Sequence, residues 1–438
     1  MAPLALLAFL LVTCPRIVLG AELALDEQIQ ALVDKNYLRL KDYYTDLHAH
    51  PELSRQEKRA SENLSRELKE AGFEVTGGVG GYGVVGGLKN GDGPTVLVRT
   101  DMDALPVKEE TGLSYASAAE VKSEDGALTP VMHACGHDMH QAVFVGAARL
   151  LSQLKSNWSG TLVFIGQPAE EIGAGAKAML KDGLFMRFPK PDFALALHVD
   201  SSLAAGAVGY REGWAFANVD SVDITVKGRG GHGAYPENSI DPVVIASRLV
   251  VALQTIVSRE IKPTEPAVVT VGAIHGGSKH NIIPDEVRLM LTVRSYTDEV
   301  RARILDAIKR IALHVAASAG AEGDLAPEVK VLDEEYTPAA YNDSALVLRV
   351  VGNFRRIFGA QNVLEKEAVM GGEDFGRYRR AAGGSLQSFM FRLGSADPKT
   401  DPKQLPSLHS SKYAPVVEPT LKTGVRAMTW AVLTVLGG

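Results

Sequence analysis

The chain has 438 residues, a formal net charge of −6, and 46% hydrophobic and 22% charged residues, which is an ordinary globular composition. This length predicts two or three domains. Because acidic and basic residues are interspersed and no polybasic stretch occurs, we expect no nucleic-acid partner.

Residues 1–20 form an apolar run that is too short to span a bilayer and that ends in small residues before Ala21. We interpret this run as a signal peptide cleaved after Gly20, which predicts a secreted or periplasmic protein. No Lys or Arg precedes the apolar core, so an uncleaved N-terminal anchor remains an alternative. Cleavage would leave Cys135 as the only cysteine of the mature chain, which excludes an intrachain disulfide.

Residues 22–72 are predicted to be helical with a break at Pro51, because apolar residues recur at helical spacing on both sides of it. His48 and His50 lie at this break. Histidine is a common metal ligand, but we predict that both residues lie behind the ligands or in the wall of the pocket.

Several short apolar strands follow, and three of them end at acidic or imidazole side chains. The strand at 95–99 runs into Asp101 and Asp103, and the strand at 161–166 leads to Glu170 and Glu171. The strand at 193–197 leads to His198 in the same way. Open α/β sheets bind ligands at the carboxyl ends of their strands. This convergence predicts a functional site.

The densest group of metal-binding side chains lies at residues 132–140, which read MHACGHDMH. Thiolate, imidazole and carboxylate groups are the usual ligands of a borderline divalent metal. Cys135 and His137 are two residues apart, so a turning backbone can direct both side chains to one point. We therefore predict a metal site here, rather than a buried free cysteine beside histidines that cap a helix.

A second domain is predicted to interrupt the first. Its strands and helices are expected in the order β-α-β-β-α-β, which is typical of the ferredoxin-like split unit, at residues 219–227, 240–257, 267–274, 286–294, 298–317 and 328–332. A helix at 343–359 and a strand at 388–393 then resume the first domain. The predicted parts are a signal peptide, a metal-binding catalytic domain in two segments and an inserted domain, at residues 1–20, 21–215 with 338–438, and 216–337.

The motifs of the chain, taken together and in order, resemble those of one family. These are DMDALP, HACGHDMH, QPAEE, a histidine after the next strand, GRGGHGAYPE, NIIP, GGEDF and LHS. They resemble the bimetal amidohydrolase and peptidase family of aminoacylases, glutamate-releasing carboxypeptidases, hippurate hydrolases and plant auxin-conjugate hydrolases. The HACGHD form is similar to the hippurate and auxin-conjugate hydrolase branch. The resemblance implies an α/β fold: a phosphorylase/hydrolase-like, mixed-sheet metallo-catalytic domain with an inserted ferredoxin-like α+β lid or dimerisation domain.

The resemblance also implies a set of metal ligands and a general base. Two divalent ions would be held by the residues that match the branch's ligands, Cys135, His137, Glu171, His198 and His409. Cysteine favours zinc, whereas this branch often works with manganese, so the ion stays open between the two. Glu170 matches the family's general base, and Asp103 matches an aspartate that orients a ligand. Asp101 falls where other branches carry a histidine ligand, and its role stays open.

The remaining implied residues concern the substrate. His232 and Asn281 match polar groups that the inserted domain supplies to the developing oxyanion, from a partner subunit in dimeric members. Arg294 and the backbone around Gly372 are candidates for binding the α-carboxylate of the substrate. We accordingly expect a homodimer formed through the inserted domain. The residues after His409 depart from the expected acyl pocket, which leaves the acyl preference open.

Three functions are compatible with these observations. We favour a metal-dependent amidohydrolase that acts on N-acyl amino acids, with a metal-activated water and Glu170 as base. A dipeptidase or carboxypeptidase would use the same metals on a free peptide, but no residue in the sequence marks a site for its ammonium group. A periplasmic solute-binding protein also fits two hinged domains, although binding alone needs no free glutamate beside a metal ligand.

Overall fold

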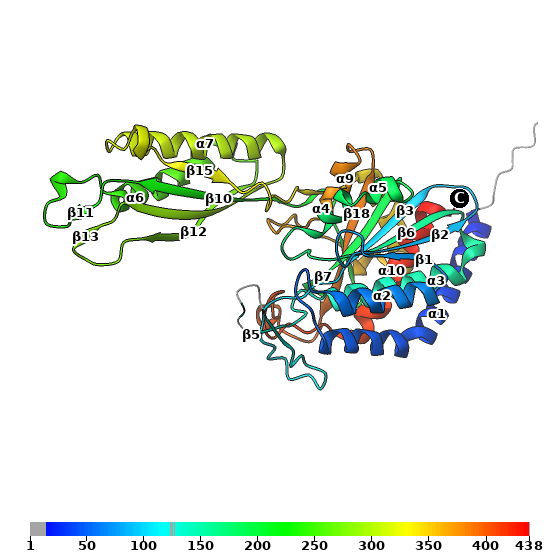
Figure 1. The fold of residues 1–438 in the computed structure, drawn as a ribbon. Coiled ribbons are helices and arrows are strands. Elements are labelled where there is room, and N and C mark those ends of the chain that lie inside the picture. The colour runs from blue at the N-terminus through cyan, green and yellow to red at the C-terminus, as the bar shows by residue number, and fades with distance from the viewer. Residues whose placement is uncertain (1–14, 123–125, 127, 438) are drawn as a thin grey trace, which may run out of the picture.

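The computed structural model describes residues 15–122, 126 and 128–437. The predicted signal peptide lies mostly outside these residues, and the prediction that it is cleaved stays a prediction. Figure 1 shows an elongated molecule, in which a large α/β domain contains the end of the chain and a smaller domain extends away from it.

The large domain is built on one mixed sheet of eight strands. In order across the sheet these are β1 (Glu74–Gly77), β2 (Val84–Asn90), β6 (Gly160–Gln167), β3 (Thr95–Asp101), β7 (Phe193–Ala204), β18 (Gln387–Ala396), β8 (Val208–Tyr210) and β17 (Val363–Glu365). The four central strands β6, β3, β7 and β18 run parallel, and antiparallel pairs join β1, β2 and β8 to them. The parallel centre brings the carboxyl ends of β3, β6 and β7 to one edge, as the sequence predicted.

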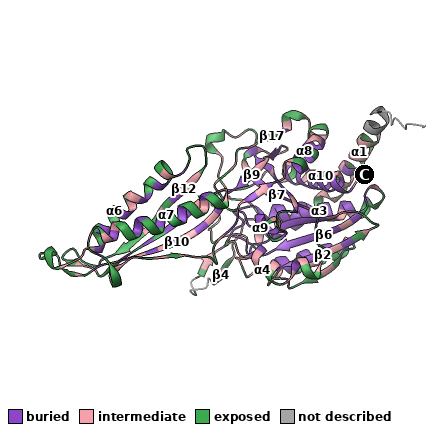
Figure 2. Cartoon of the chain, turned by 90° about the horizontal axis from the view of Figure 1, so that it is seen from above, coloured by how far each residue is buried: buried purple, intermediate pink, exposed green. Residues whose placement is uncertain are grey.

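Helices cover both faces of this sheet, because successive side chains of each strand point to opposite faces and pack into two separate apolar cores. Val96 and Val98 of β3 face one core, whereas Leu97 between them faces the other. The first core lies under α1 (Pro15–Ala49), α2 (Lys58–Glu70), α3 (His137–Gln153), α8 (Ser344–Phe358) and α10 (Val417–Leu436). The second lies under the short helices α4 (Gly175–Lys181), α5 (Leu184–Arg187) and α9 (Gly376–Ala381). Figure 2 shows the buried residues concentrated in these layers.

The smaller domain is a four-stranded antiparallel sheet with two helices on one face. Its elements are β10 (Asn218–Lys227), α6 (Pro242–Thr255), β12 (Ala267–Gly276), β14 (Glu286–Ser295), α7 (Asp298–Ala317) and β15 (Glu328–Val331). The strand order β12-β14-β10-β15 is that of a ferredoxin-like unit. Alternate residues of β10 are buried against the helices, and Asp241 and Thr297 cap the helix N-termini with their side chains.

Three short strand pairs complete the fold. β9 (Gly213–Phe216) pairs with β16 (Ala340–Asn342) where the chain crosses between the domains, and β4 (Glu120–Lys122) pairs with β5 (Leu128–Pro130) in a loop of the large domain. β11 (Gly231–His232) pairs with β13 (Ile282–Ile283) at the far tip of the small domain. None of these pairs was predicted, because strands this short carry too few residues to show a period.

Candidate metal centre and active site

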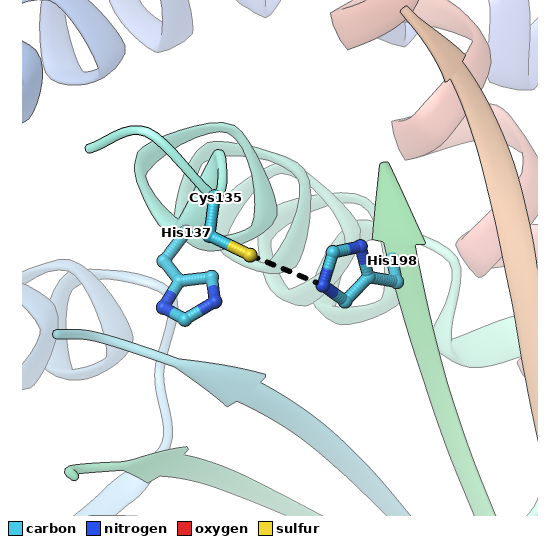
Figure 3. Close-up of side chains that lie close together, drawn as sticks. All are labelled: Cys135, His137 and His198. Atoms are coloured by element: carbon cyan, nitrogen blue, oxygen red, sulfur yellow. Dashed lines mark hydrogen bonds between the residues drawn. The ribbon is translucent and has the colours of Figure 1, made fainter. Parts of the chain in front are cut away.

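The structure brings the five predicted ligands together in two overlapping groups. The donor atoms of Cys135, His137 and His198 all lie within 4.8 Å of one another, and so do those of Cys135, Glu171 and His409. Figure 3 shows the Cys135 thiol lying between the two imidazoles, with its Sγ 3.5 Å from Nε2 of His198. Cys135 belongs to both groups, so its Sγ lies within 4.8 Å of a donor atom of each of the other four residues.

The backbone around Cys135 turns sharply enough to allow this arrangement. Gly136 has a φ of 77° and precedes the first residue of α3. A Cβ at this position would also lie 2.7 Å from Cγ2 of Val199. A glycine is therefore required between Cys135 and His137 by both conformation and space. Two non-glycine residues beside the site, Ala169 and His409, have φ values of 50° and 66°, which is a feature of functional sites.

His137 is oriented toward the cluster by Asp103. Its Nδ1 donates to the backbone oxygen of Asp103 at 2.8 Å, which leaves Nε2 facing the other donors. The Asp103 carboxylate accepts from Ser54 Oγ at 2.6 Å and from the backbone N–H of Glu171 at 3.0 Å. Asp103 thus holds two neighbouring ligands in place, which matches the orienting role implied by the resemblance.

Asp101 and His140 support the cluster from behind. His140 Nδ1 lies 2.7 Å from Asp101, while its Nε2 accepts from the backbone N–H of Val199 at 2.9 Å. Because both ring nitrogens are engaged, His140 has no free lone pair for a metal. The other oxygen of Asp101 accepts from Arg99 at 2.6 Å. Asp101, whose role the sequence left open, therefore links β3 to α3.

The donor set fits a divalent cation. Nε2 of His137 and Oε1 of Glu171 are buried and have no hydrogen-bond partner. Burial raises the pKa of Glu171 to about 7 against the opposing effect of His137, and burial also raises the pKa of the Cys135 thiol. Burial lowers the pKa of His198, which favours the neutral imidazole that binds metals. A cation would supply the missing partner and stabilise the thiolate and carboxylate.

Glu170 forms a group with His137 and Glu171 and also belongs to a second group, which consists of carboxylates. Carboxylate oxygens of Glu170, Glu373 and Asp374 lie within 4.8 Å of one another. Burial, followed by repulsion from Glu373, Glu171 and Asp374, raises the pKa of Glu170 well above its usual range. Arg99 offsets this acidity, because its Nη2 lies 3.0 Å from Glu373 and 3.1 Å from Asp374.

Sequence reasoning missed Arg99 and Glu57. Arg99 is a fully buried charge within an apolar strand, and that position was the available signal. Glu57 is also buried, and its Oε1 accepts from the backbone N–H of Ala169 at 2.8 Å and of Arg55 at 2.9 Å. Glu57 thus holds the left-handed Ala169, which precedes Glu170. No sequence feature marked Glu57, because its partner lies 112 positions away.

A cavity of ≈1390 Å³ opens in front of the two ligand groups. The small domain contributes Arg294, and the 371–373 loop contributes Gly372, so both predicted carboxylate-binding elements line the cavity with the ligands. Arg294 Nε donates to Thr292 Oγ1 at 2.9 Å, and its Nη1 donates to the backbone oxygen of Met370 at 3.4 Å. The Arg294 guanidinium is therefore directed toward the glycine loop.

The structure does not bring His232 and Asn281 to this cavity. Both are exposed at the tip of the small domain, where His232 pairs with Ile282 and Gly233 donates to the backbone oxygen of Asn281 at 2.9 Å. Figure 1 shows this tip at the end of the molecule that is remote from the large domain. A single chain in this conformation thus lacks the predicted oxyanion donors.

Residues 97–433 match the family model described as Peptidase family M20/M25/M40. The chain belongs to this family. N-acetylcysteine deacetylase of Bacillus subtilis (strain 168) is 37% identical over 80% of this chain and 87% of its own length. Hippurate hydrolase of Campylobacter jejuni is 37% identical over 75% of this chain and 82% of its own. The Bacillus subtilis YXEP protein, described as a dinuclear metal binding peptidase of the M20 family, superposes with a TM-score of 0.75 at 29% identity, covering 92% and 100%.

These comparisons confirm three predictions: the family, the mixed-sheet α/β fold and the class of enzyme, a hydrolase of amide bonds. The M20 relatives and the ligand groups also support metal binding. The role of each individual site residue stays a prediction, and so do the identity of the ions and the boundaries of the domains.

Proposed function

We propose that this M20 protein is a metal-dependent amidohydrolase that cleaves the amide bond of small N-acyl amino acids. The names of two relatives support this substrate class, since an N-acetylcysteine deacetylase and a hippurate hydrolase both take an acylated amino acid. The observation that carries the proposal is the pair Glu170 and Glu171 at the end of β6. Glu171 groups with Cys135 and His409, whereas Glu170, although it also lies near His137 and Glu171, lines the cavity beside Glu373 and Asp374.

Two divalent ions, manganese or zinc, would be held by the overlapping groups described above, Cys135, His137, Glu171, His198 and His409. When bound, such a pair polarises a substrate carbonyl and lowers the pKa of water. Glu170 then takes a proton from the attacking water and passes it to the leaving amine nitrogen. Arg294 and the backbone at Gly372 hold the α-carboxylate, which orients the scissile amide toward Glu170.

His232 and Asn281 reach the substrate in this proposal only when the domains close or when a second copy of the chain donates them. A homodimer through the small domain is supported by two of its surfaces. β12 is an unpaired edge of its sheet, and α6 exposes apolar side chains such as Val244 and Val251. An unpaired edge and an exposed apolar surface are features that a partner would cover.

We also propose that the protein is exported, with residues 1–20 removed as a signal peptide. The apolar run and the small residues before Ala21 support this. N-terminal sequencing of the protein recovered from outside the cytoplasm tests the proposal, since cleavage gives a chain that starts at Ala21. A retained Met1 on membrane-bound protein would instead favour the anchor.

Hydrolysis of N-acetyl and N-benzoyl amino acids and of dipeptides, with added Mn²⁺ or Zn²⁺, tests the proposed function. We expect the acylated amino acids to be cleaved with a higher kcat/KM than the dipeptides. A preference for dipeptides would identify a peptidase. Tight binding of these compounds without turnover in the metal-loaded protein would instead support the solute-binding function.

A further inference from the structure

The cavity is also lined by Arg392, which has no role in the chemistry described above. Arg392 lies on β18 and pairs in parallel register with His198 of β7. Partners in register direct their side chains to the same face of a sheet. Arg392 therefore lies next to a metal ligand and lines the same cavity as Arg294.

The Arg392 guanidinium lies over an aromatic ring. Its guanidinium carbon lies 4.0 Å from the centre of the Phe216 ring, and Phe216 is itself buried. Stacking of this kind engages the face of the guanidinium and leaves its N–H edges free to donate. The side chain is thus oriented for a planar, bidentate acceptor such as a carboxylate.

No acceptor for these N–H groups lies nearby in the described part of the chain. Among residues 15–122, 126 and 128–437, no carboxylate is within ion-pair distance of Arg392 and no oxygen accepts a hydrogen bond from it. The nearby Asp200 is already engaged, because it accepts from Ser202 Oγ at 2.6 Å and pairs with Lys366 at 3.2 Å. The fully buried Arg99, by contrast, pairs with three carboxylates.

Arg294 likewise has no carboxylate partner among the described residues, since it donates to a hydroxyl and to a backbone oxygen. Neither guanidinium thus forms an ion pair with a carboxylate of the described residues, although the more distant Asp200 and Glu373 favour the charged form of Arg392. A partly buried charge without a counterion is costly unless a ligand supplies one. The proposed function assigns the α-carboxylate to Arg294 and leaves Arg392 without an acceptor.

We propose that Arg392 forms a second carboxylate subsite, so that the preferred substrates are N-acyl amino acids with an additional acidic group. This inference rests on the proposed function and narrows its substrate class. The additional carboxylate can belong to the amino-acid side chain or to a dicarboxylic acyl group. Both present the same bidentate acceptor to Arg392.

The test compares acids with their neutral amides in the full-length, Mn²⁺-loaded protein. One arm uses N-acetyl-L-glutamate and N-acetyl-L-glutamine, and the other uses N-succinyl-L-alanine and its terminal amide. We expect kcat/KM to favour the acid by about 10- to 100-fold in one arm, which identifies the source of the carboxylate. In Arg392→Met this ratio falls to near one, whereas Arg392→Lys retains part of it because a point charge remains.

Arg294→Met is the matched control, and we expect it to lower kcat/KM for acids and amides alike. The same pattern in Arg392→Met would overturn the inference, because Arg392 would then bind the shared α-carboxylate. Loss of bound metal in Arg392→Met would also overturn it, in favour of a supporting role for His198. Calorimetric binding of the glutamate and glutamine compounds to Glu170→Gln and to Glu170→Gln/Arg392→Met provides a readout without turnover.

The proposed amidohydrolase function and the preference for acidic substrates are contradicted by different results. Wild-type protein that hydrolyses neutral N-acyl amino acids without preferring any acid would overturn the inference and leave the proposed function intact. Wild-type protein that hydrolyses none of the four compounds, nor N-acetyl-L-alanine, would overturn both.

Discussion

The ligand cluster at the sheet edge and the loop around His232 both consist of residues suited to catalysis, but they are held in very different ways. Around the cluster, Asp103 connects His137, Ser54 and the backbone of Glu171, and Asp101 connects Arg99 to His140. At the tip, His232 is exposed, and its side chain accepts a hydrogen bond from the backbone N–H of Ala234, two residues away.

The ligand cluster has its geometry before a substrate binds, whereas the tip can contribute to the site only after domains or subunits come together. Buried side chains with several partners keep their geometry, which metal binding and proton transfer require. An exposed histidine at the tip of the small domain can approach a substrate through domain closure or from a second subunit. In the proposed function, the tip of the small domain therefore completes the site from outside the cluster.

The largest expected effect is that of removing the metal. We expect a chelator to abolish hydrolysis and Mn²⁺ or Zn²⁺ to restore it, because the orphaned His137 and Glu171 atoms then regain a partner. Activity assays with parallel metal analysis provide the measurement. Full activity in metal-free protein would contradict the preorganised metal site.

The next effect concerns the adjacent glutamates. Glu170→Gln keeps the shape and removes the base, so we expect turnover to fall by about 10²- to 10⁴-fold with metal content retained. The matched variant Glu171→Gln should lose metal as well as activity, because Glu171 belongs to the ligand groups. If Glu170→Gln loses metal and Glu171→Gln does not, the two roles are reversed.

A smaller loss of activity is expected from a substitution at the tip of the small domain. His232→Ala should lower turnover by roughly 10²- to 10³-fold with little change in metal content or substrate affinity, since an oxyanion donor acts mainly on the transition state. His314→Ala, an exposed histidine on α7, is the matched control and should stay active. Near-normal turnover of a less stable His232→Ala protein would mean that His232 only packs the turn.

Mixing inactive His232→Ala with inactive Glu170→Gln tests donation between subunits. A hybrid dimer would contain one intact cluster facing one intact tip, so some activity should return. No recovery despite demonstrated subunit exchange would assign His232 to closure within one chain.

The smallest expected effect is on stability. His48 is buried between Asp138 at 2.6 Å and Glu109 at 3.1 Å, and although burial lowers its pKa, the two carboxylates raise it to about 10. His48→Ala leaves both acids unpaired, so we expect the free energy of unfolding to fall by about 3–5 kcal/mol. His50→Ala, at an exposed site, should change it by about 0.5 kcal/mol or less.

The pH dependence of this contribution follows from the sign of the shift. The folded-state pKa lies above the ordinary value of 6.5, so the stabilisation by His48 is complete below pH 6.5 and is lost as the pH rises through about 10. Denaturant unfolding at several pH values provides the measurement. A difference between wild type and His48→Ala that grows with pH in this window would contradict the charged triad.

Local patterns predicted the elements that carry the site. The expected strand at 193–197 and helix at 343–359 correspond to β7 and α8, because alternation and helical period reflect which side of an element is buried. Of the two histidines placed behind the ligands or in the pocket wall, His48 is buried and lies 2.6 Å from Asp138, next to the ligand His137, whereas His50 is exposed and does not line the cavity. The closing helix α10 was missed because it is apolar on nearly every side and shows little amphipathic contrast.

The sequence by itself determined which side chains meet at the edge of the sheet, because parallel strands bring their carboxyl ends together whatever surrounds them. Only the tertiary structure decided what those side chains meet. Arg99 and Asp374 are 275 positions apart, and the register between β7 and β18 places Arg392 beside His198. Such pairings depend on how separate elements pack against each other, and the hydrophobic periodicity of a single element contains no information about them. The distance of His232 from the cluster is likewise set by the packing of whole domains rather than by any residue near it.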